Sequence, residues 1–129
     1  MDAITTLPPW SGDWPTIGYG VVAWIEDNLL QPDGPDAGGP LRLSPEQVTF
    51  TLYWYAFDPD SLRFVYRRAV LRRAKGAGKT PFMAALAVAE LVGPVRPSSR
   101  SAATGVGVPV PVPWVNLAGM SETQTANTM

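Results

Sequence analysis

The sequence contains no cysteine and no histidine among its 129 residues. Without cysteine there is no disulfide framework and no thiolate metal site, and without histidine the commonest neutral metal ligand and acid–base group is missing. Zinc sites, haem ligation and histidine-dependent catalytic triads are therefore excluded. The sequence also lacks a run of about 18 to 20 apolar residues, which a membrane helix requires, and its first residues show neither the basic nor the apolar region expected of a secretory leader. We therefore expect a soluble protein of the cytoplasm with no part in a membrane.

Charged residues are also few, at 16% of the chain, whereas apolar residues make up 46%. This composition excludes wholesale disorder, because there is enough apolar material for a core. The length suits one domain of modest size, since domains commonly have about 100–200 residues. The 12 glycines and 14 prolines predict that much of the chain is loop.

The few charges are distributed unevenly between the two halves of the chain. Residues 1–62 hold nine acids and one base, whereas residues 63–129 hold nine bases and two acids. Seven of those bases fall in the segment from Arg63 to Lys79, and no acid lies between Asp60 and Glu90. Such a basic segment is typical of a site for a polyanion, but it would also simply neutralise the acidic half of the chain. Charge alone leaves both interpretations open.

Apolar spacing and capping residues predict three helices. The spacing of apolar residues from Thr16 to Leu30 follows one helical face. A second helix should run from Pro45 to about Phe57, because Ser44, Pro45 and Gln47 form a capping-box start. The third, Phe82 to Val92, is apolar nearly all round and ends at a Gly-Pro pair, so we expect a buried helix.

The segments between these helices are predicted as strands and loops. The segment Leu62 to Leu71 is interpreted as a strand buried at its second half, and Trp114 to Ala118 as a second short apolar strand. Residues 1–15 are expected to form an extended arm, residues 31–40 a loop, and the Val-Pro repeat from Val108 to Pro113 an extended surface loop. The chain thus reads as a mixed α/β protein.

A candidate phosphate-binding segment lies between the first predicted strand and the third predicted helix. Gly76 and Gly78 would leave backbone N–H groups free to point at a phosphate, and the helix that follows adds its positive end. Lys79 would reach the β- and γ-phosphates, and the Thr80 hydroxyl would complete the shell of a Mg²⁺ ion. Arg73 stands where the consensus of this loop has its first glycine. The other interpretation is a basic turn that merely begins a helix.

Gln47 is a second candidate, as a contact for adenine. Its side-chain amide can both donate to and accept from the edge of the base. The same amide is also the capping partner of Ser44, and the two roles compete for it.

Four segments together resemble one family, the large terminase subunits of tailed bacteriophages, especially those of actinobacterial hosts. The resemblance is carried in order by Leu43–Gln47, Tyr66–Pro81, Ala89–Pro94 and the stretch from Trp114 to Thr128, which includes Ser121–Thr125. It covers nearly the whole chain.

This resemblance implies a DNA-packaging ATPase. The implied fold is a partial P-loop NTPase of the additional-strand type with an incomplete parallel sheet, in which residues 1–40 are an arm and helix and residues 41–129 belong to the ATPase domain. Lys79 would be the catalytic residue of the Walker A loop and Thr80 the Mg²⁺ ligand. The implied ATP-binding residues are Gln47, Arg73, Lys75, Gly76, Ala77, Gly78, Lys79 and Thr80.

The resemblance also implies partners and leaves the enzymatic status open. The expected partners are ATP, double-stranded DNA, a small terminase subunit and a portal, together with self-association. The acidic pair of the Walker B strand and the nuclease carboxylates of the family would lie beyond Met129, so we expect a truncated fragment with negligible ATP hydrolysis. The alternative is a non-enzymatic small protein that binds DNA or an acidic partner through residues 63–79; a different P-loop enzyme is a third hypothesis.

Overall fold

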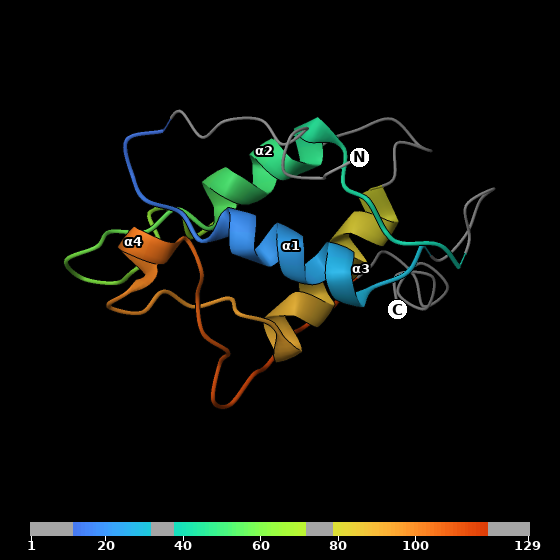
Figure 1. Ribbon diagram of the computed structural model, residues 1–129. Coiled ribbons are helices and arrows are strands. Elements are labelled where there is room, and N and C mark those ends of the chain that lie inside the picture. Colours follow the sequence, from blue (N-terminus) through green and yellow to red (C-terminus); the bar gives the residue numbers. More distant parts are fainter. Residues whose placement is uncertain (1–11, 32–37, 72–78, 119–129) are drawn as a thin grey trace.

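A computed structural model of the chain describes residues 12–31, 38–71 and 79–118 (Figure 1). These residues form four helices: α1 (Gly18–Asn28), α2 (Pro45–Trp54), α3 (Lys79–Val92) and α4 (Ser101–Thr104). The three longer ones confirm the helices predicted from apolar spacing and caps. None of the helices in the described ranges combines the length and apolarity that crossing a bilayer requires.

The expected α/β fold with a parallel sheet is wrong. Across the described ranges the backbone forms no strand but only isolated antiparallel bridges, among them Phe57 with Phe64 and Arg96 with Val108. A buried strand must be covered on both faces and paired at its edges. Neither predicted strand meets this condition, because the Val70 side chain is 77% exposed and that of Trp114 is 83% exposed. Both segments are therefore irregular: Phe64 and Leu71 pack against the core, whereas Val70 and Trp114 lie on the surface.

Helix α2 begins as its capping residues dictate. The Ser44 hydroxyl accepts a hydrogen bond from the Gln47 backbone N–H at 3.2 Å, and the Gln47 carbonyl oxygen Oε1 accepts one from the Ser44 N–H at 3.0 Å. Pro45 occupies the first turn, where its missing N–H has no intrahelical partner. The capping box predicted from the sequence is therefore confirmed.

Helix α1 packs against both α2 and α3 (Figure 1). Its contact with α2 is close enough to need a glycine, because a Cβ added at Gly18 would lie 2.7 Å from the Leu52 Cα. The Thr16 hydroxyl reinforces this contact, since it accepts from the Gly18 N–H at 3.0 Å and donates to the Leu52 carbonyl at 2.6 Å. The first turn of α1 is thus held directly on α2.

The core lies on the inner faces of these three helices. A small cluster between α1 and α2 consists of Val22, Val48 and Leu52. A larger cluster joins α1 and α3 to the segments on both sides of α2 and to the segment after α3. Its buried members are Ile17, Val21, Ile25, Leu41, Tyr55, Phe57, Phe82, Ala85, Leu86, Ala89 and Val95. Helix α3 is buried on one side only, because Leu91 and Val92 are 41% and 61% exposed.

Candidate functional site

Three of the residues predicted for the nucleotide site lie within the described part of the structure, at the amino ends of α2 and α3. Gln47 lies in the first turn of α2, and Lys79 and Thr80 begin α3. The helix predicted from Phe82 to Val92 therefore begins three residues earlier, at Lys79. Arg73, Lys75, Gly76, Ala77 and Gly78 lie outside the described residues.

An aromatic contact joins these two helix starts. The rings of Phe50 and Phe82 meet edge to face, with their centroids 5.7 Å apart. Phe50 follows Gln47 by three residues and Phe82 follows Lys79 by three residues, so each ring lies about one helical turn beyond its candidate residue. The amino ends of α2 and α3 accordingly lie on the same side of the molecule (Figure 1).

Gln47 acts as a capping residue of α2 in this structure. Its carbonyl oxygen is engaged with the Ser44 backbone, and its side chain is half-buried. An adenine that used this amide would therefore have to accept the geometry of the cap or displace it.

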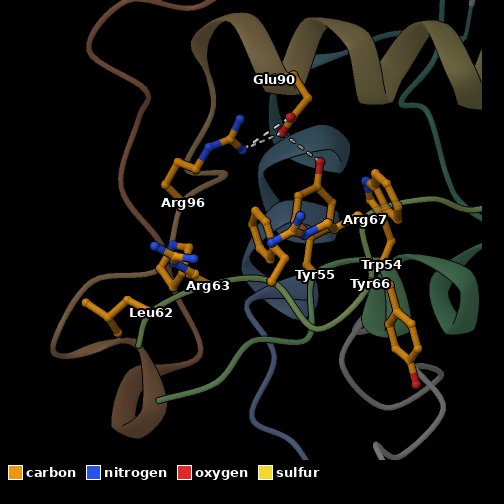
Figure 2. Close-up of a pocket in the computed structure, with 10 residues that line it drawn as sticks. Trp54, Tyr55, Leu62, Arg63, Tyr66, Arg67, Glu90 and Arg96 are labelled. Carbon is orange, nitrogen blue, oxygen red and sulfur yellow. Dashed lines mark hydrogen bonds and ion pairs between the residues drawn. The ribbon is translucent and has the colours of Figure 1, made fainter. Parts of the chain in front are cut away.

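The opposite ends of α2 and α3 border an open pocket of about 510 Å³ (Figure 2). Its aromatic lining comprises Trp54, Tyr55, Phe64 and Tyr66. Its charged lining comprises Arg63, Arg67, Glu90 and Arg96, and Leu62 and Pro97 complete the wall.

Glu90 is the centre of a polar cluster on the floor of this pocket (Figure 2). The Tyr55 hydroxyl donates to Glu90 Oε2 at 3.0 Å, and Arg96 Nη1 donates to Glu90 Oε1 at 3.2 Å. The Arg96 guanidinium also lies 5.6 Å from the centre of the Phe64 ring, which in turn meets Tyr55 edge to face. These contacts tie the end of α2, the last turns of α3 and the segment after α3 into one unit.

Burial keeps the Tyr55 hydroxyl protonated. The side chain is 1% exposed. Removal from water raises the pKa of Tyr55 far above its ordinary value, and the negative charge and hydrogen bond of Glu90 raise it further, while Arg96 opposes the shift. Tyr55 therefore acts as a neutral donor to Glu90.

The segment that carries Arg63 and Arg67 is fixed by a tight turn. The Leu62 N–H donates to the Asp58 carbonyl at 2.7 Å, and the Asp58 N–H donates to the Arg63 carbonyl at 2.9 Å. Leu62 adopts a φ of 59°, a left-handed conformation that is uncommon for a leucine. A strained residue in a pocket wall is typical of a functional site, although it does not identify the function.

Sequence reasoning did not find this pocket. Tyr55 and Glu90 are 35 residues apart, and no periodicity or motif links them. The one available signal was the isolated acid Glu90 in an otherwise apolar helix, because such a group needs a partner when it is partly buried.

The chain is similar to phage proteins. It is 37% identical over 151 aligned positions to the Gene 13 protein of Mycobacterium phage D29, covering 94% of this chain and 25% of that protein. The Gene 13 protein of Mycobacterium phage L5 matches at 37% over 150 positions, with the same coverage. The terminase large subunit of Enterobacteria phage HK97 is 38% identical over 79 positions, which cover 61% of this chain and 15% of that protein.

The chain spans about a quarter of the length of the two Gene 13 relatives. No protein-family model matches it, and no solved structure is significantly similar to it. The similarities thus relate the chain to phage proteins, one of which is a terminase large subunit.

Proposed function

We propose that this chain acts in the packaging of phage DNA, as the part of a terminase large subunit that binds ATP. The similarity to the HK97 terminase large subunit over 61% of the chain supports this function. The observation that carries the ATP site is the Phe50–Phe82 contact, because it joins the helix starts that bear Gln47, Lys79 and Thr80.

The chemistry of these residues fits Mg²⁺–ATP. The amino end of α3 has N–H groups without intrahelical partners and a positive dipole, both of which favour phosphate oxygens. Lys79 would neutralise charge on the phosphates, Thr80 would offer a hydroxyl to the metal, and Gln47 would contact the base. A helix end can supply these groups without a neighbouring β-sheet.

Binding without appreciable turnover is the expected behaviour of the chain. After Lys79 the sequence holds two carboxylates, Glu90 and Glu122. Glu90 is engaged with Tyr55 and Arg96, and it follows Lys79 by eleven residues, about 16 Å along α3. It is therefore badly placed to hold the metal or to orient an attacking water.

Titration calorimetry with Mg²⁺–ATP tests the proposal. We expect Lys79→Ala to weaken binding at least tenfold, because it removes the cation proposed to neutralise the phosphates. Arg100→Ala is the matched control, since it removes one positive charge at an exposed position beside α4. Equal affinities of the wild type and Lys79→Ala, or an equal loss in Arg100→Ala, would contradict a site at the start of α3.

A second candidate function is the binding of DNA or an acidic partner through the basic segment 63–79. The observation in its favour is that Arg63, Arg67 and Arg68 are all exposed, and that among the described residues none of them has an ion pair. A steep fall of DNA affinity with salt, unaffected by Lys79→Ala, would support this function over the first.

A further inference from the structure

The pocket at the far ends of α2 and α3 is separate from the proposed ATP site. Trp54 follows Gln47 by seven residues, about 10 Å along α2, and Glu90 follows Lys79 by eleven, about 16 Å along α3. The two sites therefore share the helices but no residue. A ligand of this pocket has to be inferred from the pocket's own chemistry.

The floor of the pocket is electrically balanced. Glu90 is paired with Arg96 and also accepts from the Tyr55 hydroxyl, so its two oxygens are both occupied. Arg96 also donates to the Val95 carbonyl at 2.9 Å, which holds its guanidinium on the floor. This cluster neither attracts nor repels an anion strongly.

Arg63 and Arg67 provide the remaining charge of the pocket lining. Both are exposed, and among the described residues neither is paired with an acid. The turn from Asp58 to Arg63 and the bridge between Phe57 and Phe64 fix the backbone that carries them. Two guanidinium groups on one short segment match a doubly negative group such as a phosphate monoester.

The aromatic side chains of the pocket favour a ligand in which a flat ring is attached to that anion. Trp54 lies next to Arg67 in the wall of the pocket, and Tyr66 lies at its edge (Figure 2). Aromatic rings beside arginines are the usual surroundings of a nucleobase. A volume of about 510 Å³ is in the range of pockets that hold small molecules.

We propose that this pocket binds a nucleoside phosphate monoester, with the phosphate on Arg63 and Arg67 and the base against Trp54. The monoester can belong to a free nucleotide or to the terminal nucleotide of a DNA strand. The proposal does not depend on the ATP site at Lys79.

Nuclear magnetic resonance titration of the whole chain tests the pocket. The probe is adenosine monophosphate, and the signal is the indole N–H of Trp54, assigned from a Trp54→Phe variant. We expect this signal to shift with adenosine monophosphate. The same shift should need at least a tenfold higher concentration of adenosine or of inorganic phosphate. A Trp54 signal that responds equally to adenosine would overturn the proposal, because the phosphate would then make no contribution.

Variants separate this pocket from the ATP site. The Arg63→Gln/Arg67→Gln double variant should lower the affinity for adenosine monophosphate at least tenfold, whereas Lys79→Ala should leave that affinity unchanged. The matched control is the double variant Arg68→Gln/Arg100→Gln. It removes the same charge from two exposed positions outside the pocket lining and leaves Arg96 in place. An equal loss in both double variants, or a loss in Lys79→Ala alone, would overturn the pocket; in the second case the nucleotide sits at the ATP site.

Oligonucleotides distinguish the two sources of the monoester. A short single strand with a 5′-phosphate that shifts Trp54 more strongly than adenosine monophosphate assigns the pocket to DNA ends. Equal or weaker binding than the free nucleotide assigns it to a nucleotide. A strand without the 5′-phosphate that binds as well as the phosphorylated one would overturn the proposal, because the arginines would then contact any polyanion.

Discussion

At the scale of single residues, Tyr55 connects packing, charge and the pocket. Its ring is part of the core, its hydroxyl donates to Glu90, and its backbone caps the end of α2. Removing the Tyr55 hydroxyl from this part-buried cluster takes away one of the hydrogen bonds that Glu90 accepts, and a hydrogen bond to a charged group is worth more than one between neutral groups. Tyr55 is therefore the residue at which a small change should have a large effect.

We predict that Tyr55→Phe lowers the free energy of unfolding by about 1.5–3 kcal/mol at neutral pH, the usual value of a hydrogen bond to a charged group. Denaturant titration followed by circular dichroism measures this difference. Tyr66→Phe is the control, since Tyr66 is 45% exposed, and we expect it to change stability by less than about 0.5 kcal/mol. Equal effects of the two variants would mean that the bond to Glu90 contributes nothing.

The raised pKa of Tyr55 gives this difference a pH dependence. The folded pKa lies above the unfolded value of 10.0, so the protonated folded state is favoured and its stability is fully present below pH 10. Above pH 10 the unfolded state ionises first, and the wild type loses up to about 1.4 kcal/mol per pH unit. We therefore predict that the advantage of the wild type over Tyr55→Phe shrinks between pH 10 and 11. A constant difference over that interval would contradict a buried, neutral Tyr55.

At the scale of elements, the three longer helices could be predicted from the sequence, whereas the short helix α4 and the lack of strands among the described residues could not. Local signals decide where α2 begins, because Ser44, Pro45 and Gln47 act within one turn. The segment around Val70 has the composition of a strand, but a strand needs a partner and two covered faces, and these are not local properties. The same reason explains why the helix starts that bear the candidate residues could be predicted, whereas the cluster of Tyr55, Glu90 and Arg96 could not.

We predict that the capping box and nucleotide binding can be separated at Gln47. Gln47→Glu keeps an acceptor for the Ser44 N–H and adds a negative charge at a helix start, so stability should change by less than about 0.5 kcal/mol. The affinity for ATP should fall at least fivefold, because the carboxylate has no N–H donor for the base and repels the phosphates. Thermal unfolding and titration calorimetry measure the two effects.

Ser44→Ala is the complementary variant. It removes the hydroxyl that caps the Gln47 N–H and should cost about 1 kcal/mol of stability while the ATP affinity stays within twofold. Ser99→Ala, at an exposed turn, serves as the control for a lost serine hydroxyl. If Gln47→Glu and Ser44→Ala both reduced stability and left ATP binding intact, Gln47 would be a capping residue alone.

At the scale of the whole molecule, the described residues leave an apolar surface on α3. Met83, Leu91 and Val92 are 40%, 41% and 61% exposed, while the opposite side of the helix is packed against α1 and the core. Exposed apolar side chains that gather on one helix are typical of an interface or of a tendency to aggregate. The expected apolar character of this helix is thus correct, but its complete burial is not.

We predict that the chain associates with itself as its concentration rises, through the exposed side of α3. Sedimentation velocity should show a rising mean sedimentation coefficient for the wild type, and Leu91→Lys/Val92→Lys should remain monomeric over the same range, because two cations desolvate poorly. The control, Val112→Lys/Trp114→Lys, adds the same charge at side chains that are 86% and 83% exposed but lie outside α3. If the control variant lost self-association to the same extent, net charge rather than the α3 surface would govern the association. A wild type that stayed monomeric at every concentration would contradict the prediction, because the exposed side of α3 would then remain in contact with water.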